Sequence, residues 1–116
     1  GLKDLEGFSH IYLVYHFHRA RGIQLQVVPY MDTNKRGVFA TRSPLRPAHV
    51  GISIVALLGV NGNRLRVAGL DMVDGTPLLD IKPYVPQFDY REGATSGWIT
   101  GPQSNVEGKR SDNRFG

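Results

Sequence analysis

Residues 52–67, with the sequence ISIVALLGVNGNRLRV, set the fold class of this chain. The apolar run over residues 52–58 is long enough for either a buried strand or a helix, so its composition alone leaves both open. The residues after it favour a strand. Asn-Gly at 61–62 supplies the positive φ angles of a tight hairpin turn, and Leu65 and Val67 then alternate with arginines. We therefore expect two antiparallel strands joined at this turn.

Further short strands are expected on both sides of this hairpin. Aromatic and β-branched residues alternate with other types over residues 8–18, and the alternation returns over 23–27, as half-buried strands require. Residues 38–40 are also apolar. Residues 78–82 are read as another strand, because a turn signal at 74–77 precedes them and prolines follow.

These patterns predict an all-β chain. Helical candidates are scarce, and six or so short strands with turn residues between them indicate a small barrel, closed or partly open, because closure removes exposed strand edges. We expect one domain over residues 1–100, since 116 residues with 41% apolar side chains build a single core. Residues 101–116 are Gly-rich and polar and predict a tail outside that core.

The composition excludes several classes of protein and of site. The chain has no cysteine, which excludes disulfides, zinc–thiolate sites and a thiol nucleophile. It has no run of about 18 apolar residues and no signal-peptide pattern, so we expect a soluble protein in the cytoplasm that makes no membrane contact. Fourteen Lys and Arg against ten Asp and Glu give a formal charge of +4, which favours a polyanionic partner where the charges cluster.

The densest local pattern is FATRSPLRP, at residues 39–47. Two prolines prevent a regular helix and hold two arginines and two hydroxyls close together. A guanidinium offers forked donors and a hydroxyl adds a neutral one, so such a loop suits a carboxylate or a phosphate. An exposed connecting loop with solvated arginines is the open alternative.

A second candidate site contains the carboxylates of Asp71 and Asp74, three residues apart at a strand end. Either can accept hydrogen bonds from a ribose, an amine or an adenine amino group. The alternative is a turn capped by an aspartate, with Gly75 at a positive φ.

The histidines offer a third possibility. His16 and His18 fall on one face of the predicted strand, in phase with His10, and two imidazoles so spaced can bind a metal, as in cupin barrels. No acidic ligand follows His18, so partly buried histidines with satisfied hydrogen bonds are the commoner outcome. The sequence has no phosphate-binding glycine loop and no nucleophile elbow, which supports neither a Rossmann cofactor site nor a serine hydrolase.

Four blocks along the chain resemble one known family. They are LEGFSH at 5–10, FHR at 17–19, GVFATRSPLRP at 37–47 and DMVDGTPLLDIKPY at 71–84. In this order they resemble the TsaA-like (TrmO) family of tRNA methyltransferases. The resemblance implies a β-barrel enzyme, unlike the Rossmann type, that works as a homodimer with S-adenosylmethionine near the subunit interface. It also implies a tRNA substrate whose N6-threonylcarbamoyladenosine, beside the anticodon, is methylated on N6.

The resemblance further implies which residues form the site. Carried over by position, the cofactor contacts are His18, Arg19, Arg42, Ile52, Asp74, Gly75 and Thr76. His18 is thereby assigned to the cofactor, and no metal is expected. The acceptor N6–H is a poor nucleophile until its proton is polarised or removed. The candidate catalytic residues for that step are Asp71, Asp74 and His49, with the substrate's own carboxylate as a further one.

The threonylcarbamoyl group adds a carboxylate and a hydroxyl to the substrate. We expect Arg46 and Lys82 to bind it in a loop-lined pocket with His49. Plain adenosine would leave these charged donors unpaired in the pocket, which disfavours its binding. Arg46 is the preferred anchor, since Pro47 restricts the backbone beside it.

The chain departs from the family pattern in two places. Residues 46–51 read RPAHVG where the family has RPNPIG, so an amide and a proline are replaced by Ala48 and His49. The family also has an N-terminal strand and a Pro-Arg-Gln motif ahead of the first block, whereas this chain begins almost at that block. Two other functions therefore stay open: a non-catalytic RNA-binding barrel on the same scaffold, and a metal-dependent, cupin-like enzyme.

Overall fold

The structure is a computed structural model of the 116-residue chain, and it describes residues 1–30 and 32–99. The chain divides into two compact units. Unit 1 consists of Gly1–His16 and Ile52–Tyr90, and unit 2 of Phe17–Gly51 with the segment from Arg91 onward. Unit 1 contains a four-stranded sheet and unit 2 a two-stranded one.

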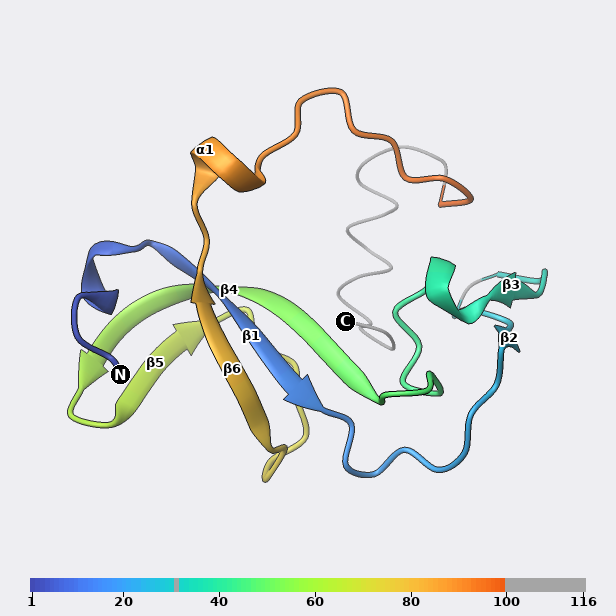
Figure 1. The fold of residues 1–116 in the computed structure, drawn as a ribbon, viewed down its shortest axis with the longest axis horizontal. Helices are drawn as coiled ribbons and strands as arrows, with labels where there is room; N and C mark the ends of the chain where they lie inside the picture. The colour runs from blue at the N-terminus through green and yellow to red at the C-terminus, as the bar shows by residue number, and fades with distance from the viewer. Residues whose placement is uncertain (31, 100–116) are drawn as a thin grey trace. The chain divides into compact units, whose positions relative to one another are not determined.

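The sheet of unit 1 has the strand order β5-β4-β1-β6 (Figure 1). Its strands are β1 (His10–His16), β4 (Val50–Asn61), β5 (Arg64–Ala68) and β6 (Leu78–Pro83). β4 pairs antiparallel with β5, and β1 pairs antiparallel with β6. The predicted strands over residues 8–18, 52–58 and 78–82 are thereby confirmed, each as part of this sheet.

The core of unit 1 lies on one face of this sheet. Ile11, Leu13 and Tyr15 alternate along β1 and are at most 4% exposed, and Val55 on β4 is 1% exposed. Successive strand residues point to opposite faces, so the even-numbered residues of β1 lie on the other side. The Tyr15 hydroxyl lies 3.0 Å from the Ser53 Oγ, which gives both oxygens a hydrogen-bond partner.

The predicted hairpin is confirmed, with its turn one residue later than expected. Asn61 pairs with Arg64, so the two turn residues are Gly62 and Asn63. Gly62 has φ 62°, and Asn63 is not among the residues with positive φ. A glycine at the first turn position with positive φ is the arrangement of a II′ hairpin, whereas the sequence suggested Asn-Gly.

Short elements make up the rest of the described chain. They are the 3-10 turns η1 (Leu5–Gly7) and η2 (Val38–Ala40), the strand pair β2 (Gln26–Val27) and β3 (Arg36–Gly37), and the helix α1 (Pro86–Asp89). The strand expected over residues 23–27 was wrong except for β2. Ahead of β2 the backbone groups bond to loops instead of to a neighbouring strand. The Gln24 N–H donates to the Leu45 carbonyl, and the Leu25 carbonyl accepts from the Val38 N–H.

The expectation of a mostly β chain is confirmed, with α1 as a single small helix among residues 1–30 and 32–99. The four-stranded sheet described there ends at β5 and β6 and does not close on itself, so the barrel stays a prediction. The expected tail at 101–116 lies outside the described residues. No helix among those described is long and apolar enough to cross a membrane.

The two faces of the sheet predict different responses to truncation. Ile11→Ala removes a fully buried side chain and should lower the free energy of unfolding by about 2–5 kcal/mol. Ile54→Ala is the matched control, because Ile54 is 49% exposed on the opposite face and should cost about 0.5 kcal/mol or less. Urea unfolding of both variants measures the difference, and equal losses would contradict the assignment of the faces.

Candidate functional site

The loop that follows η2 is held by its own hydroxyl groups. The Thr41 hydroxyl donates to the Val38 carbonyl at 2.8 Å and accepts from the Ser43 N–H at 3.2 Å. The Ser43 hydroxyl, on a side chain that is buried, accepts from the Leu45 N–H at 3.2 Å. Prolines interrupt regular backbone bonding here, so side-chain oxygens take its place. The two hydroxyls expected to contact a ligand thus shape the loop.

The two arginines of this loop have different surroundings. The Arg46 Nη1 donates to the Thr41 carbonyl at 2.7 Å and to the Ser43 carbonyl at 3.3 Å, and its guanidinium lies 6.0 Å from the centre of the Phe39 ring. Arg46 therefore closes the loop on itself. Arg42 is exposed, and its guanidinium has no hydrogen-bond or ion-pair partner in the part of the chain that the structure describes. Of the two, Arg42 is the one placed to take an anion from solution.

His49 joins this loop to the segment after β1. Its N–H donates to the Arg46 carbonyl at 3.1 Å, and its carbonyl accepts from the Phe17 N–H at 2.7 Å. Its backbone has φ 53°, in the left-handed region, and these bonds hold it there. Nδ1 lies 2.9 Å from the Pro44 carbonyl, which can only accept, so Nδ1 carries the proton of the neutral ring. Any proton-accepting role then belongs to Nε2.

His18 and Arg19 lie in the turn that the Phe17–His49 bond fastens. The Ala20 N–H donates to the Phe17 carbonyl at 3.0 Å, which closes the turn. His18 is half-buried and Arg19 is exposed. The structure therefore joins these two predicted cofactor residues to the loop of Arg42 through backbone hydrogen bonds.

The remaining predicted residues lie in unit 1, most of them at one end of the sheet. Gly75 has φ 84°, as a turn requires, and the Thr76 N–H and hydroxyl both donate to the Val73 carbonyl. The His16 N–H donates to the Pro77 carbonyl at 3.0 Å, which ties this turn to the end of β1. Ile52 is at the same end, since its neighbour Ser53 bonds to Tyr15, the strand partner of Leu78.

Lys82 is not brought together with that turn. It pairs with Tyr12 in the strand register, four residues beyond Leu78, which is about 13 Å along β6. Its Nζ lies 3.3 Å from the Asp80 carboxylate, and both side chains are exposed. Asp71 and Asp74 are exposed in the loop between β5 and β6.

The predicted site residues thus divide between the two units. Unit 2 holds His18, Arg19, Arg42, Arg46 and His49, and unit 1 holds Ile52, Asp71, Asp74, Gly75, Thr76 and Lys82. Among residues 1–30 and 32–99, no three His, Cys, Asp or Glu side chains form a group that could hold a metal ion.

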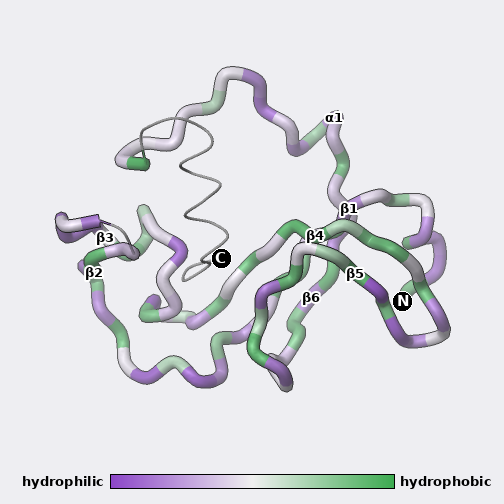
Figure 2. The backbone as a smooth tube through the Cα atoms, turned by 180° about the vertical axis from the view of Figure 1, so that it is seen from behind, coloured by the Kyte–Doolittle hydropathy of each residue, from purple (hydrophilic) through white to green (hydrophobic). Residues whose placement is uncertain are grey.

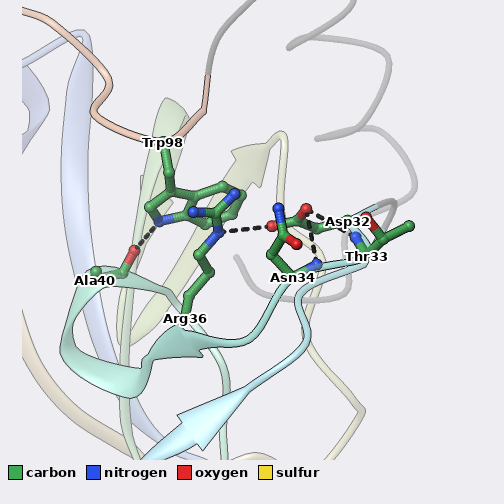
Figure 3. Close-up of polar contacts among 6 residues, drawn as sticks. All are labelled: Asp32, Thr33, Asn34, Arg36, Ala40 and Trp98. Carbon is green, nitrogen blue, oxygen red and sulfur yellow. Dashed lines mark hydrogen bonds and ion pairs between the residues drawn. The ribbon is translucent and has the colours of Figure 1, made fainter.

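Sequence reasoning missed a cluster that braces the loop, formed by Asp32, Arg36 and Trp98 (Figure 3). The Trp98 indole N–H donates to the Ala40 carbonyl at 2.7 Å, immediately before Thr41. The Arg36 guanidinium lies 5.1 Å from the centre of the Trp98 ring, a cation–π contact, and its Nε lies 2.9 Å from an Asp32 oxygen. The sole signal in the sequence was that Trp98 is the one tryptophan.

The Arg36 hydrogen bond holds the pKa of Asp32 below the ordinary value of an aspartate. Burial opposes this shift, and the backbone N–H groups of Asn34 and Thr33, which donate to the Asp32 carboxylate, add to it. The ionised carboxylate is therefore the form that the folded cluster favours.

Known proteins resemble this chain along most of its length. A family model described as the tRNA-methyltransferase O N-terminal domain matches residues 1–90. A probable S-adenosyl-L-methionine-binding protein of Pyrococcus abyssi is 56% identical over 115 residues, which cover 99% of this chain and 62% of that protein. The tRNA (adenine(37)-N6)-methyltransferase of Homo sapiens is 40% identical over 91 residues, which cover 76% of this chain and 21% of that protein.

Solved structures of similar proteins share the fold. A crystal structure of TrmO has a TM-score of 0.71 and 38% identity, over 98% of this chain and 56% of that one. A crystal structure of TrmO from Pseudomonas aeruginosa has a TM-score of 0.69 and 36% identity, over 98% of this chain and 54% of that one. The chain therefore spans less than two thirds of the length of each of these four relatives.

The lowered pKa of Asp32 predicts an acid transition in the loop. A depressed carboxylate pKa contributes stability that is complete above the unfolded value, about 3.9, and is lost as the pH falls through the folded value. Emission from Trp98, the single tryptophan, should therefore change in that acid range. Asp32→Asn should remove this transition and Glu6→Gln should preserve it. A transition that persists unchanged in Asp32→Asn would contradict the link.

Proposed function

The chain belongs to the tRNA-methyltransferase O N-terminal domain family, and from this premise we propose that it transfers a methyl group from S-adenosylmethionine to N6 of adenosine 37 in tRNA. The observation that carries the proposal is the exposed Arg42, which has no ionic partner among the described residues and is presented by a loop that Arg46 and Trp98 hold from both sides. The names of the relatives supply the reaction class.

The residues of unit 2 are suited to the cofactor. S-adenosylmethionine carries a carboxylate, and a guanidinium without another partner binds carboxylates through charge-assisted hydrogen bonds. We assign that contact to Arg42 and place His18 and Arg19 beside it, because backbone bonds join their turn to the loop. Ile52, Asp74, Gly75 and Thr76 in unit 1 stay predicted cofactor contacts.

The bound cofactor supplies an electrophilic methyl group on a sulfonium. The protein's task is to hold the acceptor nitrogen in line with that methyl and to receive the proton that N6 gives up as the new N–C bond forms. His49, Asp71 and Asp74 are the proposed acceptors, together with a carboxylate of the substrate. In His49 the acceptor atom would be Nε2, since Nδ1 donates to the Pro44 carbonyl.

For the substrate we propose adenosine carrying a threonylcarbamoyl group, with Arg46 and Lys82 as its ligands. A guanidinium has five N–H donors, so the use of Nη1 within the loop leaves Arg46 donors for a carboxylate. Lys82 already faces the Asp80 carboxylate at 3.3 Å, and a substrate carboxylate would compete with that ion pair. Arg46 is thus the stronger candidate.

We also propose that the protein acts as a homodimer and that it does so in the cytoplasm. Two-fold pairing is the commonest assembly of soluble proteins. Light scattering at micromolar concentration with S-adenosylmethionine present tests the dimer, and a monomer would refute it.

A second function, RNA binding without catalysis, predicts tRNA binding with no affinity for the cofactor.

Arg42 should dominate cofactor affinity. Arg42→Ala should weaken S-adenosylmethionine binding by about 1.5–3 kcal/mol, or roughly 10- to 150-fold, because one charge-assisted contact is lost. Calorimetry measures the change, and Trp98 emission reports the loop independently. Arg64→Ala, which removes the same charge from β5, is the matched control and should bind the cofactor as the parent does. Parental affinity in Arg42→Ala would refute the assignment.

Discrimination between substrates tests the reaction itself. Labelled methyl groups should be transferred to tRNA from cells that make the threonylcarbamoyl modification and not to tRNA from cells that lack it, since only the first offers a carboxylate to the site. Equal incorporation into both would refute the specificity. No incorporation into either by the full-length protein, with tRNA binding retained, would favour the RNA-binding function.

A further inference from the structure

The face of the unit 1 sheet that lies opposite the core carries aromatic and basic side chains at one end. β5 alternates regularly, and Val67 pairs with Leu57, which is in phase with the core residue Val55. Arg64 and Arg66 therefore point to the opposite face. The even-numbered residues of β1 lie on that face too, and so does Lys82, the register partner of Tyr12.

These side chains belong to the same end of the sheet. The Leu57 N–H donates to the Ser9 carbonyl at 2.8 Å, so the start of β1 lies beside the part of β4 that pairs with Arg66. The Tyr84 N–H donates to the His10 carbonyl at 3.1 Å, which brings Tyr84 to the other side of β1. From β5 to Tyr84 is three strand spacings, about 14 Å.

The side chains of Arg64, Arg66, His10, Tyr12, Tyr84 and Lys82 form a strip across this end of the face. Gly59 leaves room between the arginine half of the strip and its aromatic half. Arg66 pairs with it, and an Arg66 Nη2 lies 3.8 Å from the place a Cβ on Gly59 would occupy. The guanidinium thus lies across β4, over a position that has no side chain. In Figure 2, β4 is largely hydrophobic, whereas β5 beside it has hydrophilic stretches.

The two halves of the strip carry different side chains, aromatic rings in one half and arginines in the other. The rings of Tyr12 and Tyr84 have centroids 5.8 Å apart, and His10 meets Tyr84 edge-on at 6.3 Å. Arg64 and Arg66 are exposed, and neither side chain makes a hydrogen bond or an ion pair with any other described residue. The aromatic half offers ring faces, and the arginine half offers uncompensated positive charge.

The Asp89 carboxylate makes the two ends of the strip differ in charge. Burial raises the pKa of Tyr12, and the nearby charges of Asp89 and Tyr84 add to the shift, which agrees with a position of Asp89 at the aromatic end. The Asp89 carboxylate accepts from the Val85 N–H at 2.8 Å. The Asp89 charge disfavours phosphate at the aromatic end, and its carboxylate oxygens can accept hydrogen bonds from base amino groups. The charge of Asp80 is offset by Lys82, whose Nζ lies 3.3 Å away.

We propose that this strip, formed by Arg64, Arg66, His10, Tyr12, Tyr84 and Lys82, binds unpaired nucleotides of the RNA substrate, with phosphates on the two arginines and bases stacked on the two tyrosines. Stacking on side chains requires splayed bases, so a loop or a single strand fits the strip and a duplex does not. The inference rests on the proposed function, which makes tRNA the partner.

The two halves of the strip predict different signatures in RNA binding. Arg64→Ala with Arg66→Ala should weaken binding of a fluorescent anticodon stem-loop RNA at least tenfold and reduce the slope of log affinity against log salt by about 1.4, since each phosphate contact to a single strand contributes about 0.7. Tyr84→Ala should weaken binding by a similar factor and leave the slope unchanged. Lys3→Ala with Lys35→Ala removes two exposed charges elsewhere and should change neither.

Calorimetry with S-adenosylmethionine on the same variants separates this inference from the proposed function. Variants that bind the cofactor as tightly as the parent but bind RNA more weakly support the strip. They support it even if the parent transfers no methyl group. Parental RNA affinity in both the arginine and the tyrosine variants overturns it. Loss of dimers on light scattering without loss of RNA affinity also overturns it, in favour of contact with a second copy.

Discussion

Unit 1 depends on the burial of one face of β1. Ile11, Leu13 and Tyr15 lie in the core, while the strand is bonded to β4 on one side and β6 on the other. Because the side-chain period of a strand is two, a slip of one residue would bring His10, Tyr12 and His16 into the core and expose the apolar set. The same constraint that fixes the register therefore fixes which side chains the opposite face presents to solvent.

Unit 2 is organised by the need to satisfy backbone polar groups in a loop that contains prolines. The carbonyls of Thr41 and Ser43 are taken by Arg46, and the carbonyl of Ala40 by Trp98. Residues that look like ligand-binding groups in the sequence thus serve the loop, and Arg42 is left facing solvent. A rigid loop presents its charge with less loss of conformational entropy on binding than a mobile one.

Much of the fold could be predicted because its signals are local. Alternation identified β1, and the sequence Asn-Gly-Asn identified the hairpin but fits a turn at either of two positions, so the turn was placed one residue early. The alternation around Ile23 and Leu25 misled, because the backbones of Gln24 and Leu25 bond to loops and the side chains of Ile23 and Leu25 are exposed. The local pattern of residues 39–47 indicated the loop of Arg42, and the likeness to a family agreed with it. Trp98 was missed because its partner is 58 residues away in the sequence.

The bond between Trp98 and Ala40 has a consequence for the order in which the protein is made. Translation proceeds at about 5–20 residues per second, so the ribosome needs about 3–12 s to add the 58 residues that separate the two partners. The loop of Arg42 leaves the ribosome ahead of Trp98 by the same interval, and until then the indole that braces it is absent and water takes its place at the Ala40 carbonyl. The rate of translation between the two positions therefore sets how long the nascent loop lacks this hydrogen bond.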